Sequence, residues 1–247
     1  MSPKWIVAIL SVHIFSNEVI IFLILLEYKY TETFDITPEV QAAYDDHGYI
    51  IVRNMFDKEE LTNVKRVLED SDINEKHGYG IPDGKGKNAK LVIWSHPGND
   101  VTGIVARSRK VVDSCQKILP GSQKCGRIDH FPVAGQTMAD IERINEIKKR
   151  HPLKHVELDP GDALIFDANL IHTSGPNNSP NRRWALLYSY CLKSNNPVYK
   201  HHHPNYTPLE KVPNSAIKDC KNYTDFSGKD FMDPGVDKTV KADTLDK

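Results

Sequence analysis

The most apolar part of the chain is a segment near its N-terminus. Residues 5–26 (WIVAILSVHIFSNEVIIFLILL) contain 17 apolar residues in 22, and as a helix they would span roughly 33 Å against a hydrocarbon core of about 30 Å. His13, Asn17 and Glu18 interrupt the run, and a charge near the centre of a span costs about 3 kcal/mol. The sequence after it has no small-residue cleavage site, so residues 1–30 are expected to be an uncleaved membrane anchor. An apolar extension outside the fold is the alternative.

Helical and strand periodicities follow one another in the next half of the chain. The run GYIIV (48–52) predicts a buried strand, and an amphipathic segment at 37–46 precedes it. A helix is expected from Asp57, where Glu60 three residues later completes a capping-box pattern. Two more helices are expected at 101–119, which ends at Pro120-Gly121, and at 137–150, which begins at a threonine cap.

Short strands dominate the sequence after residue 150. The expected strands are HVEL (155–158), ALIF (163–166), NLIH (169–172) and RWALLYSYCL (183–192), separated by turns rich in Pro, Gly and Asn. This spacing is typical of an antiparallel barrel or sandwich. The Gly- and Lys-rich segment 77–90 predicts a mobile loop. The expected fold class is therefore α+β.

Composition narrows the possible partners. A content of 39% hydrophobic and 26% charged residues is ordinary for a globular domain with a core. The net charge of -1 and the pI of about 6.8, with Lys and Arg scattered, argue against a nucleic-acid partner. The four cysteines lack the spacing of a zinc site or a disulfide scaffold and are expected to be free thiols: Cys115, Cys125, Cys191 and Cys220.

A histidine and an arginine flank one turn in the strand-rich part. In the last expected strand, Arg183, Ala185, Leu187 and Ser189 alternate onto one face, and bulkier side chains occupy the other. A face of small side chains that begins with an arginine leaves room for a carboxylate ligand, and such a bidentate pair is worth about 1.5–3 kcal/mol when sheltered. His172, before the turn, is a candidate metal ligand. Ordinary hydrogen bonding or an ion pair is the alternative for both.

Three stretches carry a resemblance to a known family. GYIIVRNMF (48–56), VELDPGDALIFDANLIHTSGPNNSPNRRW (156–184) and NNPVYKHHHPNYTPLEKVP (195–213) resemble the phytanoyl-CoA dioxygenase family of Fe(II)/2-oxoglutarate oxygenases. Within that family they are most similar to the L-proline trans-4-hydroxylase-like branch. The resemblance covers nearly everything from about residue 36 onward.

The resemblance implies a fold, two cofactors and three site residues. The fold is a double-stranded β-helix, or jelly roll, in which Fe(II) is held by two histidines and one carboxylate with open positions for 2-oxoglutarate and O2. His172 matches the distal iron ligand, and Arg183 matches the residue that grips 2-oxoglutarate, with Ser189 on the same face as a second cofactor contact. Residues 36–247 are then one domain, made of a helical part (36–120), the remaining jelly-roll strands (121–193) and a C-terminal extension (194–247).

The same resemblance implies a His-x-Asp motif that this chain lacks. No histidine in the sequence has an aspartate two residues later, and only His155 has a glutamate there. The family places the missing motif on strands before the GSQKCGRIDH element, which here follows Pro120 directly. Loss of one supporting residue costs about 10–100-fold in metal affinity or activity, so loss of two direct ligands is expected to cost at least about 10²–10⁴-fold. The jelly roll is then incomplete, without its central strands.

Two interpretations of function remain. One is a 2-oxoglutarate-dependent hydroxylase of a small amino acid such as L-proline, with acyl-CoA a weaker candidate, impaired in this chain by its incomplete iron site. The other is a non-catalytic truncated relative or splice variant that acts by binding only, membrane-anchored if residues 5–26 insert. The family implies a cytoplasmic location, and the anchor implies a membrane.

Overall fold

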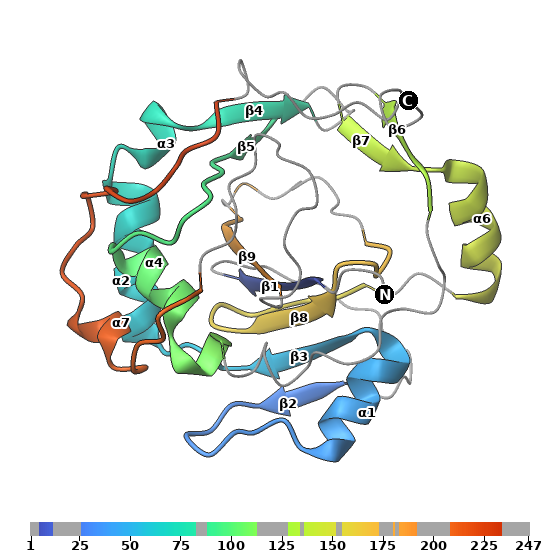
Figure 1. The fold of residues 1–247 in the computed structure, drawn as a ribbon, viewed down its shortest axis with the longest axis horizontal. Coiled ribbons are helices and arrows are strands. Elements are labelled where there is room, and N and C mark those ends of the chain that lie inside the picture. Colours follow the sequence, from blue (N-terminus) through green and yellow to red (C-terminus); the bar gives the residue numbers. More distant parts are fainter. Residues whose placement is uncertain are drawn as a thin grey trace.

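In a computed structural model, a five-stranded sheet lies beside a group of helices and two separate hairpins (Figure 1). The structure describes residues 5–11, 26–82, 88–112, 128–133, 136–151, 155–172, 180, 183–191 and 208–233. In chain order its elements are β1 (Trp5–Ser11), β2 (Glu27–Lys29), α1 (Pro38–His47), β3 (Tyr49–Arg53), α2 (Lys58–Asp70), α3 (Ile73–Lys76), β4 (Tyr79–Pro82), β5 (Asn88–Leu91), α4 (Val101–Arg107), β6 (His130–Val133), β7 (Gln136–Ala139), α6 (Ile141–Arg150), β8 (Ala163–Asp167), β9 (Ala185–Cys191) and α7 (Ala216–Asp219).

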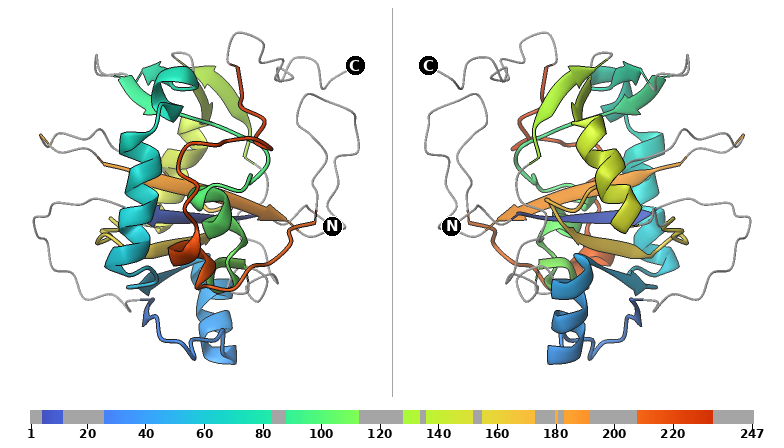
Figure 2. Two further views of the ribbon diagram at one scale, coloured as in Figure 1. Left: turned by 90° about the vertical axis from the view of Figure 1, so that its left-hand side faces the viewer. Right: turned by 90° about the vertical axis from the view of Figure 1, so that its right-hand side faces the viewer.

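The main sheet has the strand order β2-β3-β8-β1-β9 (Figures 1 and 2). Strand β3 pairs antiparallel with β8, and β1 pairs antiparallel with both β8 and β9. The expected strands at 48–52, at 163–166 and within 183–192 are confirmed as β3, β8 and β9. Together with the helices they make a mixed α and β fold. The described residues form open sheets, so the jelly-roll core and the loss of its central strands stay predictions.

Strand β1 corrects the expectation for the N-terminus. Residues 5–11 form a strand in the sheet, so the expected anchor helix over 5–26 is wrong for these residues. Their backbone groups bond to neighbouring strands, which supplies the partners that a helix would otherwise supply internally. Residues 12–25 lie outside the described part. No helix among the described residues is long and apolar enough to cross a membrane.

Helices α2, α4 and α7 contact one another along one side of the main sheet. Helix α2 begins at Asp57 with the predicted capping box, in which Asp57 accepts from the amide of Glu60 and Glu60 accepts from the amide of Asp57. On β9, buried Leu186 and Tyr188 face these helices, and the Tyr188 hydroxyl donates to the carbonyl of Thr102 at 3.0 Å. Burial raises the pKa of Tyr188 well above its ordinary value. The core therefore lies between the bulky face of β9 and the helices.

Several expected elements differ in the structure. The expected helix 101–119 stops at Arg107, where Ser108 bridges to Val212, and helical residues resume at 109–112. The expected helix 137–150 begins only at Ile141, because Gln136–Ala139 pair with β6 and Asp140, not Thr137, caps the helix. The expected mobile loop 77–90 contains the paired strands β4 and β5. Residues 155–158 and 169–172 are not strands.

The C-terminal extension packs on the helices between residues 208 and 233. The Val212 amide donates to the Arg107 carbonyl at 3.0 Å, and the Arg109 amide donates to the Val212 carbonyl at 3.1 Å. Lys229 lies wholly buried beside Asp100, with 3.0 Å between Nζ and Oδ1. This part of the extension therefore belongs to the folded core.

Candidate functional site

The candidate site residues lie on the sheet face opposite the helices, which we call the open face. The register places Phe166 of β8, Val7 of β1 and Ser189 of β9 in one cross-strand row, and Leu164, Ile9 and Leu187 in another. Directly opposed residues of antiparallel strands share a face. Leu187 is 59% exposed and Ala185 and Ser189 are exposed, while Leu186 and Tyr188 between them are buried. The predicted alternation of β9 into a bulky face and a face of small side chains is confirmed.

The turn before β8 is fixed by the segment that follows β3. The buried carboxylate of Asp162 accepts from Arg53 at 2.5 Å and from the amide of Asn54 at 2.9 Å. Gly161 has φ +99°, and a Cβ there would lie 2.4 Å from the carbonyl oxygen of Phe56. Two of the three stretches that carry the resemblance, RNMF and DPGD, therefore dock directly against each other.

A second turn brings His172 back over the open face. Strand β8 ends at Asp167, whose carboxylate accepts from the amide of Asn169 at 2.7 Å and from its side-chain nitrogen at 3.0 Å. The amide of Leu170 donates to the Asp167 carbonyl at 2.9 Å, which closes the turn. The His172 ring then packs edge-on against Phe166, with 4.9 Å between centroids.

The hydrogen bond of the His172 ring selects one tautomer. Nδ1 lies 2.8 Å from the carbonyl oxygen of Leu170, and because a carbonyl only accepts, Nδ1 carries the proton. Nε2 then keeps its lone pair, the arrangement that metal-bound histidines adopt. His130 makes the same contact with the carbonyl of Ile128 at 2.8 Å. The pose is compatible with a ligand but is not specific to one.

Arg183 and His172 lie toward opposite ends of the open face. His172 packs on Phe166, which is in the row of Ser189, whereas Arg183 precedes β9 by two residues. Six residues of extended chain separate Arg183 from Ser189, which is roughly 20 Å. Both are exposed. The structure therefore brings Ser189 toward the His172 end and does not bring Arg183 there.

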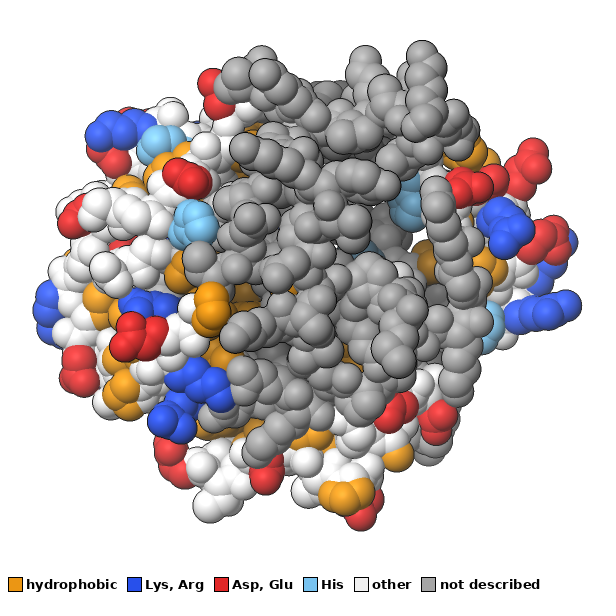
Figure 3. Space-filling view, in the orientation of Figure 1, with side chains coloured by type: hydrophobic (Ala, Val, Ile, Leu, Met, Phe, Trp, Pro, Cys, Tyr) orange, Lys and Arg blue, Asp and Glu red, His pale blue; other side chains and the backbone are white. Residues whose placement is uncertain are grey.

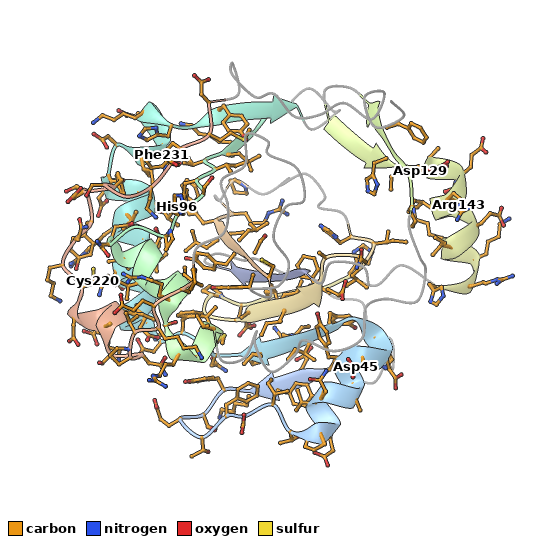
Figure 4. All side chains as sticks on the ribbon, in the orientation of Figure 1. Asp45, His96, Asp129, Arg143, Cys220 and Phe231 are labelled. Carbon is orange, nitrogen blue, oxygen red and sulfur yellow. The ribbon has the colours of Figure 1, made fainter. Side chains whose placement is uncertain are left out.

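The described residues do not assemble an iron site. No group of three His, Cys, Asp or Glu side chains among them is placed to hold a metal ion. His155 and Glu157 are exposed and lie outside any strand. Other residues of ligand type are spread around the rim of the molecule, as Figure 4 shows for Asp45, His96, Asp129 and Cys220. Residues 173–179 and 201–203 lie outside the described part. One histidine without its partners does not fit a three-ligand ferrous centre.

Two buried ion pairs among the described residues lie away from the open face. Lys110 contacts Glu60 at 2.6 Å, and Lys229 contacts Asp100. Burial lowers the pKa of both lysines, and the neighbouring carboxylate opposes that shift in each case. Around the side shown in Figure 3, described acidic and basic side chains are interspersed at the rim. These ion pairs stabilise the packing of the helices and of the C-terminal extension. They do not take part in the candidate site.

Sequence reasoning missed the residues that shape the site from below. Asp162 and Arg53 lock the turn before β8, and Asp167 and Phe166 place His172. A signal was available for the first pair, since an Asp after Pro-Gly commonly satisfies turn amides. None was available for Phe166, whose contact with His172 depends on how the chain folds back.

Comparison with known proteins agrees with this architecture. Residues 110–185, which include His172 and Arg183, match the family described as phytanoyl-CoA dioxygenase (PhyH). No curated protein matches the sequence. The crystal structure of EctD from S. alaskensis in its apo form superposes with a TM-score of 0.52 at 15% identity, over 76% of this chain and 91% of that chain. The likeness to EctD shows a shared fold, and the similarity to the phytanoyl-CoA dioxygenase family rests on residues 110–185.

Proposed function

We propose that this chain is a binding-only member of the phytanoyl-CoA dioxygenase family, which takes up 2-oxoglutarate or a similar dicarboxylate through Arg183 and does not sustain iron-dependent turnover. The observation that carries the proposal is the absence of any His-x-Asp pair from all 247 residues. His172 and Arg183 lie within the segment that is similar to the family. The chain therefore keeps the arginine that the resemblance assigns to 2-oxoglutarate, but only one of the three residues that it assigns to iron.

The absence of two iron ligands argues against iron-dependent turnover. Each supporting residue of a metal site contributes about 10–100-fold to affinity or activity, so two absent direct ligands lower both by at least about 10²–10⁴-fold. The sequence passes from Pro120 directly to GSQKCG, where the resemblance expects further strands. We attribute the loss to excision of that segment by splicing, by gene-model error or by divergence. A transcript that carries His-x-Asp between codons 120 and 121 would identify this chain as a variant of a working enzyme.

Arg183 is the favoured carboxylate clamp. Arg183 precedes β9 by two residues, in phase with the exposed positions Ala185 and Ser189, and a bidentate bond to a carboxylate is worth about 1.5–3 kcal/mol. The separation of roughly 20 Å along the strand prevents Ser189 from gripping the same carboxylate. Ser189, in the row of Phe166, therefore contributes at most a contact to another part of the bound molecule.

Calorimetric titration with 2-oxoglutarate in a metal-free buffer tests this proposal. Arg183→Ala is expected to weaken binding about 10–100-fold, the loss that corresponds to about 1.5–3 kcal/mol. Ser189→Ala is expected to change affinity less than Arg183→Ala does. Arg150→Ala, at the exposed end of α6, is the matched control and should leave affinity unchanged. Equal affinities for wild type and Arg183→Ala would refute the clamp.

A working hydroxylase of a small amino acid such as L-proline is the second candidate. The ring pose of His172 favours it, because Nε2 is presented as in metal-bound histidines. The test is succinate formation from 2-oxoglutarate with Fe(II) and free proline. Turnover that matches an intact relative, and that His172→Ala abolishes while His130→Ala does not, would establish this candidate against the binding-only proposal.

A further inference from the structure

Residues 5–11, the first part of the N-terminal apolar segment, form an interior strand of the main sheet. Strand β1 runs between β8 and β9, with Ile6–Leu10 opposite Asp167–Ala163 and Trp5–Ser11 opposite Cys191–Ala185 (Figure 1). Residues 5–11 lie far outside the segment that matches the family. The strand is thus contributed by a part of the chain that carries none of the family's sequence signals.

The two neighbours of β1 cannot substitute for it. Both are antiparallel to β1, so they run parallel to each other, separated by two strand spacings or about 9.6 Å. Without a strand between them, β8 and β9 each present an unpaired edge across a gap that neither fills. Unpaired edges of this kind recruit other strands. The position between β8 and β9 is therefore an acceptor slot for one extended segment.

The composition of residues 5–11 suits that slot. Four of the seven residues, Trp5, Ile6, Val7 and Ile9, are β-branched or aromatic, the types enriched in strands. A strand bonded on both edges lies in the interior of a sheet and favours such an apolar run. The same residues begin the segment whose hydropathy predicts a membrane span. The composition of residues 5–11 thus suits both the interior of a sheet and a membrane span.

We propose that residues 5–11 act in cis as a replacement strand, which occupies the β8–β9 slot in place of the strands that the family resemblance expects after Pro120, and that this role excludes use of the segment as a membrane anchor. Each backbone amide of the segment bonds either to a neighbouring strand or within a helix, and not to both. The sheet state therefore removes the helix that insertion requires.

The replacement strand also sets the spacing of the two candidate site halves. Strand β8 leads into the turn that carries His172, and β9 begins two residues after Arg183. Occupation of the slot fixes β8 and β9 two strand spacings apart, and withdrawal of the segment releases them. This consequence for ligand binding rests on the proposed function. The position of the strand does not rest on it.

A native thiol makes the placement testable in the full-length chain. Trp5 pairs with Cys191, and directly opposed Cα atoms of antiparallel strands lie about 4.5–5.5 Å apart, within the range that a disulfide spans. Trp5→Cys should therefore form an intramolecular bond to Cys191 under mild oxidation, identified by mass spectrometry of the linked peptides. Because burial raises the pKa of the Cys191 thiol, mildly alkaline buffer is used.

Two matched variants control this experiment. Ile6→Cys pairs with Tyr190 and points to the other face, so it should cross-link to Cys191 several-fold less. The pair Ser11→Cys/Ala185→Cys replaces small residues at the other end of β1 and should also cross-link, even if loss of Trp5 perturbs the fold. Equal yields from Ile6→Cys and Trp5→Cys, no bond in either designed variant, or a bond only between two chains would overturn the cis replacement strand. Failure of 2-oxoglutarate binding would leave this result unaffected.

Discussion

At the scale of single residues, the site is held by turns and by buried polar groups. Gly161 allows the DPGD turn to approach Phe56, and Asp162 accepts from Arg53 and Asn54 beneath it. His172 is placed by a turn that closes on Asp167. The resemblance singles out His172 and Arg183 as candidates, because a motif can be matched in the sequence alone. It could not give their separation, which depends on the register of β1 against two strands distant in sequence.

Gly161→Ala tests the docking of the two motif segments. The new Cβ would lie 2.4 Å from the Phe56 carbonyl oxygen, and the backbone there has φ +99°. Strain and the steric clash should lower the free energy of unfolding by at least about 1–3 kcal/mol, measured by urea denaturation. Gly228 also has a positive φ, but a Cβ there would lie 3.9 Å from its nearest neighbour, the Cα of Gly98, so Gly228→Ala should cost less. Equal losses would show that close approach to Phe56 is unimportant.

Lys229 is the residue whose loss should cost most outside the site. It and Asp100 are both fully buried, and Nζ also donates to the Pro97 carbonyl at 2.6 Å. Lys229→Met leaves the Asp100 charge without its cation, so unfolding free energy should fall by about 3–5 kcal/mol. Asp100→Asn/Lys229→Met should regain part of that loss. Lys221→Met, which is exposed, should stay within about 0.5 kcal/mol of wild type. A loss no larger than that of Lys221→Met would contradict the account.

At the scale of elements, the sequence predicts those helices and strands that depend on neighbouring residues. The capping box of α2 and the apolar runs of β3, β8 and β9 were predictable because each depends on residues within a few positions. The start of α6 was not predictable from neighbouring residues, because Gln136–Ala139 pair with β6 and Asp140 therefore caps the helix. Likewise the turn at Asp167 displaced the strand expected at 169–172.

The start of α2 provides a pH-dependent test. Partial burial raises the pKa of the Asp57 carboxyl, but bonds from Lys218 and from the amides of Glu60 and Glu59 outweigh it, so the net shift is downward. A carboxyl with a lowered folded-state pKa stabilises the protein above its ordinary value of 3.8, and that contribution disappears as pH falls through the folded-state value.

Asp57→Ala and Asp57→Ser separate the cap from the ion pair. At neutral pH, Asp57→Ala should cost about 0.5–2 kcal/mol because it removes the cap. Asp57→Ser keeps a capping oxygen and loses only the exposed pair with Lys218, so its cost should be smaller. Thermal unfolding measured from pH 7 downward should show the difference between wild type and Asp57→Ser shrinking below about pH 4. A difference that grows on acidification would contradict this assignment.

At the scale of the whole molecule, the N-terminal segment shows where hydropathy alone misleads. The apolar residues 5–11 begin a run long enough to span a membrane, and they also fit the interior of a sheet bonded on both edges. Sequence periodicity could not distinguish these environments, because the β8–β9 slot exists only once distant strands are in place.

The central claim is that half of the family's metal centre is absent from this chain. Anaerobic equilibrium dialysis of the full-length protein against ferrous iron, with 2-oxoglutarate present and followed by metal analysis, tests it most directly. The account predicts weak, substoichiometric iron that His172→Ala leaves unchanged. One tightly held ferrous ion per chain, lost on His172→Ala and kept on His130→Ala, would contradict it.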